Sequence, residues 1–180
     1  MAKRPPIRYV KAVARILAEL QRAVMNRAAL LAIEKEHATG AGIFRIAYLA
    51  LFNDYVAHAM KVFEQSTRVA SLWYLYRSDQ TLLDAFAAGA KIDLRKLTEV
   101  SCKLKHIRDK THFHIDADAV LATGEVWREA GITGRQLSTA IDQAWKLVCH
   151  LQQHHGLEAV HLLPEMSTER MRKQVARALN

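Results

Sequence analysis

The residues of this chain that could act together in a chemical reaction lie in one short segment, Arg-Asp-Lys-Thr-His-Phe-His, from Arg108 to His114. Arginine carries a permanent charge on a planar fork that binds phosphate. Histidine is the side chain whose unperturbed pKa lies nearest to neutrality, so it can accept or donate a proton. One arginine and one histidine are enough to cleave an RNA backbone without a metal, because the nucleophile is the 2′-hydroxyl of the substrate.

The segment follows a stretch whose apolar residues repeat with helical spacing. Asp93 is a residue type that caps the start of a helix, and Arg108 ends the stretch. With about 100° per residue, Arg108 falls about 40° from Leu104, inside the apolar stripe of this helix. A guanidinium there is costly unless it is paired or faces a cavity. One interpretation is therefore a structural ion pair with Asp54 or Glu64 on the neighbouring helix.

The same geometry separates the two candidate catalytic residues. If the helix continues, His114 lies about 120° around the axis from Arg108. The two side chains can then meet only if the helix ends first or if two copies of the chain share one site. We therefore expect a homodimer with a composite site, in which the Arg108–His114 segments of both copies line one groove.

The rest of the chain has few helix breakers, with seven glycines and three prolines in 180 residues. Its apolar residues follow helical spacing almost throughout, and strand patterns are nearly absent. In the first half of the chain we expect a helix of about 28 residues after Pro5-Pro6, a second helix from the break at residues 39–42 to Tyr76, and a short helix from the cap Ser78 to Ala87. In the second half we expect the helix that starts at Asp93, a short helix around Trp127, a helix from Gly134 to His155, and a basic helix capped by Ser167.

Long helices joined by short loops are typical of an antiparallel helical bundle. We therefore predict an all-α fold. Residues 1–163 form the bundle, and residues 164–180 form a basic C-terminal helix or tail.

The charge balance favours a polyanionic partner. The 26 lysines and arginines exceed the 18 acidic residues, which gives a net charge of +8. Nucleic acid, an anionic membrane and an acidic protein all fit this balance.

The chain shows no sign of secretion or membrane insertion. Cys102 and Cys149 form no CxxC motif and fit a reduced compartment better than a disulfide scaffold. The basic N-terminus is not followed by the apolar run of a signal peptide, and no segment reaches the about 18 apolar residues of a membrane span. We expect a cytoplasmic protein without membrane contact.

A metal site is the rival interpretation of the same segment. The run from Thr111 to Asp116 reads T-H-x-H-x-D, which resembles the first part of the metallo-β-lactamase metal motif. That motif needs another histidine directly after the aspartate, where this chain has Ala117, and it belongs to longer chains with strands. We therefore expect no metal and no cofactor.

The motif and its position resemble the HEPN superfamily. The signature of that superfamily is an arginine, four to six residues and a histidine, often with Asn, Asp or His directly after the arginine; Arg108, Asp109 and His114 match it. The segments 47–54 and 69–72, and Ile107-Arg108-Asp109-Lys110 with the later His-Ile-Asp, resemble the AbiU-type abortive-infection branch. The resemblance covers roughly residues 10–155.

This resemblance implies a metal-independent endoribonuclease that acts as a dimer. His114 would take the 2′-hydroxyl proton, and Arg108 would stabilise the charge on the scissile phosphate. Asp109 would orient Arg108 or a histidine, while Lys110 and His112 would contact the substrate; His112 lies too close to Arg108 for the family spacing. The products would carry 2′,3′-cyclic phosphates. Such an enzyme would be the toxin of a toxin–antitoxin or phage-defence system, with an antitoxin protein as a further partner.

Two non-enzymatic interpretations stay open. The first is a HEPN-like module that binds RNA, a nucleotide or a protein partner without cleaving anything. The second is a plain helical adaptor in which Arg108 forms a structural ion pair. The presence of both Arg108 and His114 favours the enzyme, because a scaffold needs neither.

Overall fold

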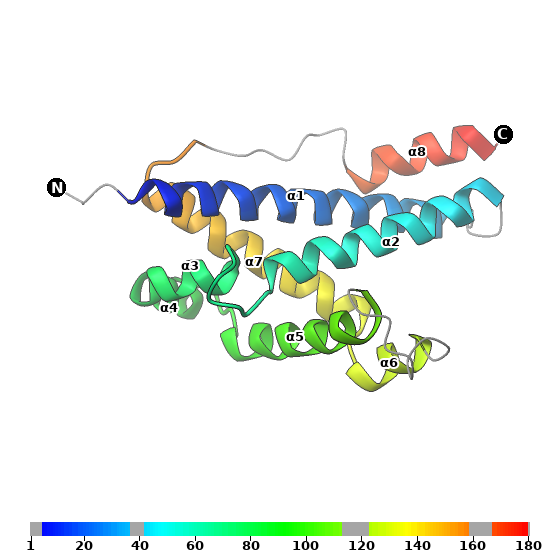
Figure 1. Cartoon of the computed structure of the whole chain (residues 1–180). Helices are drawn as coiled ribbons and strands as arrows, with labels where there is room; N and C mark the ends of the chain where they lie inside the picture. The colour runs from blue at the N-terminus through cyan, green and yellow to red at the C-terminus, as the bar shows by residue number, and fades with distance from the viewer. Residues whose placement is uncertain (1–4, 37–41, 113–122, 159–166, 180) are drawn as a thin grey trace.

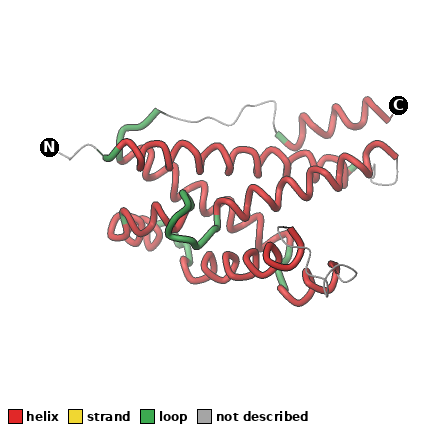
Figure 2. The backbone as a smooth tube through the Cα atoms, viewed as in Figure 1, coloured by secondary structure: helices red, strands yellow, loops and turns green. Residues whose placement is uncertain are grey.

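The computed structural model describes residues 5–36, 42–112, 123–158 and 167–179. All regular elements in these residues are helices, and none is a strand (Figure 2), so the prediction of an all-α chain is confirmed. In chain order the elements are α1 (Ile7–Lys35), α2 (Gly42–Val62), α3 (Leu72–Ser78), α4 (Gln80–Gly89), α5 (Leu94–Ile107), the π-helical turn η2 (Arg108–His112), α6 (Thr123–Ala130), α7 (Gly134–His154) and α8 (Thr168–Leu179).

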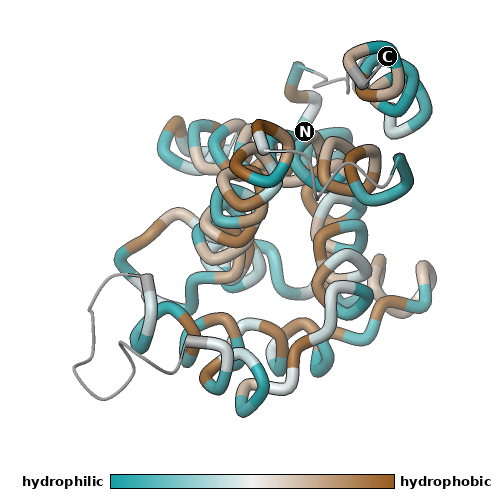
Figure 3. The backbone as a smooth tube through the Cα atoms, turned by 90° about the vertical axis from the view of Figure 1, so that its right-hand side faces the viewer, coloured by the Kyte–Doolittle hydropathy of each residue, from teal (hydrophilic) through white to brown (hydrophobic). Residues whose placement is uncertain are grey.

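Helix α1 is the longest element and organises the others around it. It starts directly after Pro6, where the fixed backbone angle of proline favours a first helical turn. Its buried stripe includes Val13, Ile16, Leu17 and Leu20, and α2, α7 and α8 all pack against it. Figure 1 shows α1 running along the molecule with α2 beside it. Apolar residues recur along each long helix and meet in one shared core (Figure 3).

The second helix is shorter than the sequence pattern predicts. The expectation of one helix to Tyr76 is wrong, because α2 ends at Val62 and α3 begins only at Leu72. Two serines explain the break. The Ser66 hydroxyl accepts a hydrogen bond from the Arg68 backbone N–H at 3.3 Å, and the Ser71 hydroxyl caps α3 by accepting from the Tyr74 N–H at 3.3 Å. Such local bonds compete with the helical hydrogen bonds of the backbone.

The start of the next helix also differs from the prediction. Ser78 does not cap it, since Ser78 is the last residue of α3 and donates its hydroxyl to the Tyr74 carbonyl at 2.9 Å. Helix α4 begins at Gln80 instead. The predicted caps Asp93 of α5 and Ser167 of α8 are confirmed by hydrogen bonds to backbone N–H groups of the first helical turns.

One apolar stripe of α2 changes its surroundings along the helix. Val56, Met60 and Phe63 at its end are buried, whereas Ile46 and Leu49 on the same stripe are 67% and 54% exposed. Thus the end of this stripe lies in the core, and its beginning presents apolar side chains to solvent.

Helix α8 lies inside the region predicted as a basic C-terminal helix. It packs against α1, and Arg172 joins the two helices through an ion pair to Glu36 at 2.8 Å. Lys173 and Arg177 are exposed on its outer side. None of the described helices combines the length and apolarity needed to cross a membrane.

Candidate functional site

Arg108 marks the point where the α-helical backbone of α5 changes into the wider turn η2. Ile107, directly before it, is completely buried, and the Arg108 side chain is 23% exposed. The Thr111 hydroxyl donates to the Ile107 carbonyl at 2.7 Å, which satisfies a carbonyl near the helix end. Short π-helical turns are often found at functional sites, so the local backbone is consistent with a site at Arg108.

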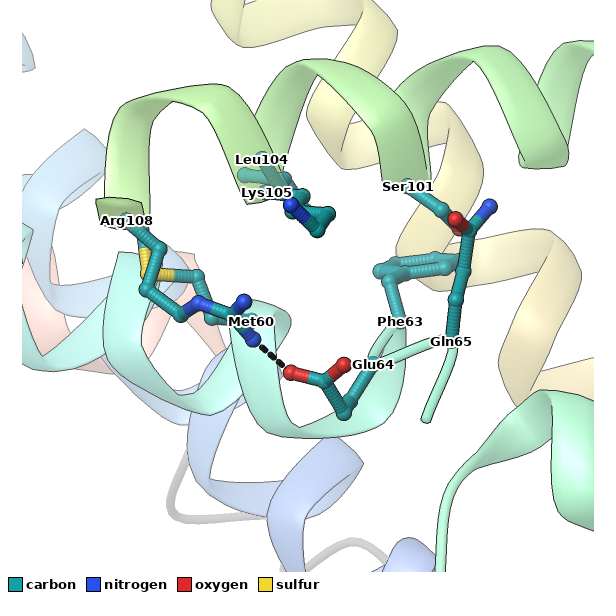
Figure 4. Close-up of a pocket in the computed structure, with 8 residues that line it drawn as sticks. All are labelled: Met60, Phe63, Glu64, Gln65, Ser101, Leu104, Lys105 and Arg108. Atoms are coloured by element: carbon teal, nitrogen blue, oxygen red, sulfur yellow. Dashed lines mark ion pairs between the residues drawn. The ribbon is translucent and has the colours of Figure 1, made fainter. Parts of the chain in front are cut away.

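Two carboxylates hold the Arg108 guanidinium. One nitrogen forms an ion pair with Glu64, which lies in the turn after α2, and Figure 4 shows the two side chains pointing toward each other. Nε and Nη2 both donate to Oδ1 of Asp109, at 2.9 and 2.8 Å. The sequence analysis gave Asp54 or Glu64 as the ion-pair partner of Arg108 on the neighbouring helix, and the structure shows that it is Glu64.

A second cation completes this cluster. Lys105 lies one helical turn before Asp109 and donates to its Oδ2 at 2.7 Å. Partial burial opposes ionisation of Asp109, but the hydrogen bonds from Lys105 and Arg108 lower its pKa below the ordinary value. The same contact raises the pKa of Lys105. Sequence reasoning missed Lys105, although its spacing of four residues from Asp109 is the usual signal for such a helical pair.

The pocket beside Arg108 is small. Met60, Phe63 and Leu104 line it together with Glu64 and Arg108 (Figure 4), and its volume is about 10 Å³. That space holds about one water molecule. A phosphate group bound to Arg108 therefore has to approach from the solvent side and compete with Glu64 for the guanidinium.

The remaining predicted site residues are only partly within the described structure. Lys110 lies in η2 and is partly buried, and η2 also contains the backbone of His112. His114 lies outside the described residues, as do Asp116 and Ala117 of the metal interpretation. The structure therefore brings together Arg108 and Asp109, while the meeting of Arg108 with His114 stays a prediction.

A buried histidine on α2 belongs to a separate polar network. His58 Nδ1 lies 2.5 Å from Glu19 Oε2, and its Nε2 lies 3.2 Å from Asp54 Oδ2. Arg15 and Lys61 also pair with Glu19, at 2.8 and 3.3 Å. Both nitrogens of His58 thus have partners within the fold, as expected for a histidine with a structural role.

The histidines at the end of α7 are also engaged in the fold. His155 Nε2 lies 3.0 Å from Asp79 Oδ2, and His150 stacks on Phe86 with 4.0 Å between ring centroids. Within the described ranges, no three histidine, cysteine or acidic side chains are grouped closely enough to hold a metal ion.

Comparison of the chain with family models, with curated proteins and with solved structures finds no match. The motif, the all-helical fold and the geometry around Arg108 are therefore the features from which a function can be proposed.

Proposed function

We propose that this protein is a metal-independent endoribonuclease with a HEPN-like helical bundle. The observation that carries the proposal is the placement of Arg108 at the transition from α5 to η2, with Asp109 bonded to its guanidinium. Asp109 fixes the orientation of the Arg108 guanidinium. A phosphate can approach this guanidinium from the solvent side. Lys110, two residues after Arg108, is the side chain proposed to contact a flanking phosphate.

The proposed reaction is an intramolecular transesterification of the RNA backbone. His114 removes the proton of the 2′-hydroxyl, the 2′-oxygen attacks the phosphorus, and the bond to the 5′-oxygen breaks. The leaving 5′-oxygen takes up a proton, and the product is a 2′,3′-cyclic phosphate. Arg108 stabilises the negative charge that develops on the phosphate oxygens during the attack.

A second copy of the chain completes the site in this proposal. In a two-fold dimer, His114 of the second copy supplies the proton for the 5′-oxygen, so each histidine has one role. The exposed apolar residues Ile43, Ile46 and Leu49 on α2 support association, because apolar side chains of this size favour burial. We place this dimer in the cytoplasm, as the toxin of a toxin–antitoxin or abortive-infection system restrained by a cognate antitoxin.

The ion pair of Arg108 with Glu64 favours a second candidate function. An arginine already held by two carboxylates fulfils a structural role, as in the plain helical adaptor, and it is also compatible with a HEPN-like module that binds RNA, a nucleotide or a partner without cleaving it. The two candidates differ in what they predict for a purified sample, because only the enzyme shortens RNA.

The test is incubation of the purified protein with total RNA in the presence of EDTA. The proposal predicts cleavage that Arg108→Ala or His114→Ala abolishes while the helical circular dichroism signal stays unchanged. Arg95→Ala is the matched control, since Arg95 is an exposed arginine at the other end of α5. Cleavage that disappears with EDTA and returns with zinc supports the metal interpretation instead, and intact RNA in every sample supports the binding module.

A further inference from the structure

A stripe of basic residues runs along the exposed side of α1. Its members are Arg8, Lys11, Arg15 and Arg22, all of them exposed. At about 100° per residue, the four positions fall within an arc of about 60° around the helix axis. We call these four residues the α1 basic stripe.

The α1 basic stripe has little opposing charge. Glu19 is the only acidic residue between Ile7 and Ile33, and it is buried. Arg15 pairs with Glu19 at 2.8 Å. In the part of the chain that the structure describes, no carboxylate forms an ion pair with Lys11 or Arg22. These cations therefore create a positive potential on this side of the molecule.

An aromatic ring lies beside the start of the stripe. Tyr74 of α3 is partly exposed, and the Arg8 guanidinium carbon lies 6.0 Å from the centre of its ring. Arg8, Lys11 and Tyr74 line a groove of about 220 Å³ together with the short side chains of Ala12 and Ala70. The groove thus combines an aromatic ring, with Arg8 over one face, and a second cation, Lys11.

These features match a single strand of RNA. Single-strand sites combine a positive track for the phosphates with aromatic rings on which the bases stack. With a rise of about 1.5 Å per residue, the steps from Arg8 to Lys11, Arg15 and Arg22 measure about 4.5, 6 and 10.5 Å along the helix. Flexible basic side chains on such steps can reach successive phosphates of one strand.

We infer that the α1 basic stripe and Tyr74 form a binding site for single-stranded RNA that is separate from Arg108. Figure 1 shows α3 and the start of α1 at one end of the molecule, away from the end of α5 that carries Arg108. The choice of RNA as the ligand rests on the proposed function. The site itself holds the strand by its backbone and by one stacked base, and it takes no part in bond cleavage.

The test measures binding with a probe that cannot be cleaved by 2′-hydroxyl attack. The probe is a fluorescent 2′-O-methyl RNA of about twelve nucleotides, which is within the usual length of single-strand sites. Fluorescence anisotropy gives its affinity for the native protein over a range of salt concentrations. The charge variant is Lys11→Ala/Arg22→Ala, and its matched control is Arg95→Ala/Arg135→Ala, two exposed arginines in the first turns of α5 and α7.

The site predicts two quantitative results. Lys11→Ala/Arg22→Ala reduces the magnitude of the salt slope of log affinity by about 1.4, because each phosphate contact on a single strand contributes about 0.7. Tyr74→Ala weakens binding at least about fivefold, whereas Tyr74→Phe, which keeps the ring, binds normally. The control variant keeps the native slope and affinity, and circular dichroism verifies the fold of every variant.

Three results overturn the inference. The first is no binding of the probe by the native protein. The second is that the stripe variants bind the probe with native affinity while Arg95→Ala/Arg135→Ala loses affinity for it. This result assigns the RNA to the face of α5 and α7. The third is a Lys11→Ala/Arg22→Ala protein that binds the RNA probe as the native protein does but no longer binds phosphatidylserine vesicles. This result assigns the stripe to an anionic membrane.

A parallel cleavage assay separates this inference from the proposed function. If the native protein binds the probe through the stripe but leaves RNA intact, the proposed function fails and the binding site stands. If the native protein cleaves RNA and the stripe variants bind and cleave normally, the binding site fails and the proposed function stands.

Discussion

Arg108, at the end of α5, forms an ion pair with Glu64, which lies just beyond the end of α2. Their side chains are only 23% and 16% exposed, so water screens the pair weakly. This contact fixes the candidate catalytic arginine to the core and at the same time occupies the group that has to bind phosphate.

The first prediction concerns the energy of this pair. Glu64→Gln and Arg108→Gln should each lower the free energy of unfolding, and a double-mutant cycle in urea should give a coupling of about 1 to 2 kcal/mol. The cycle for Lys105→Gln and Asp109→Asn is the control and should give a smaller coupling, because those side chains are 56% and 41% exposed. Equal couplings for both pairs would show that the Arg108–Glu64 contact has no special structural role.

The second prediction concerns the effect of Glu64 on the reaction. If Glu64 competes with the substrate phosphate, Glu64→Gln frees the guanidinium and should lower KM for RNA. Arg108→Lys should lose activity, since an ammonium cannot form the forked contact. A Glu64→Gln protein that is folded and inactive would make Glu64 part of the active arrangement instead of a competitor.

The third prediction concerns acid stability. Burial opposes ionisation of Glu19, but the hydrogen bond from His58 and the charge of Lys61 lower its pKa below the ordinary value of 4.5. The unfolded chain therefore binds this proton more readily than the folded chain. Stability from Glu19 is present above about pH 4.5 and is lost as the pH falls through the folded pKa.

The corresponding measurement is the urea midpoint as a function of pH on the acid side of neutrality. The native protein should lose stability as the pH falls, and Glu19→Gln should show a flatter profile with a lower midpoint near neutral pH. Glu99→Gln is the control, because Glu99 is exposed, and it should follow the native profile. A Glu19→Gln profile that parallels the native one contradicts this assignment.

The fourth prediction concerns the two histidines of the motif. His114→Ala should slow RNA cleavage at least about a hundredfold, the usual effect of losing a general base. His112→Ala should have a smaller effect, since we assign it to substrate contact. Single-turnover rates for the two variants make the comparison, and the reverse order would identify His112 as the base.

The sequence was sufficient to predict those helices whose boundaries are set by nearby residues. Asp93 predicted the start of α5, and the helical spacing of its apolar residues predicted a buried side, which contains Leu97 and Leu104. The end of α2 was not predictable from apolar spacing, because the bonds of Ser66 and Ser71 with the backbone interrupt the pattern.

The candidate site was predictable only in part for a similar reason. Its residue types and its position at a helix end followed from the sequence. The choice of Glu64 over Asp54 depended on where α2 ends, and the turn η2 has no periodic signal in the sequence. Asp54 instead binds Asn26 at 2.7 Å, a contact between α1 and α2 that composition does not indicate.

The most direct test of RNA cleavage by 2′-hydroxyl attack is to determine the product ends after incubation of a defined RNA with the protein in EDTA. The proposed roles of Arg108 and His114 predict fragments with 2′,3′-cyclic phosphate ends from the native protein, none from Arg108→Ala or His114→Ala, and none from the same RNA carrying 2′-O-methyl groups. Cleavage of the 2′-O-methyl RNA, or fragments that carry 5′-phosphates and free 3′-hydroxyls, would contradict attack by the 2′-hydroxyl and with it the proposed roles of Arg108 and His114.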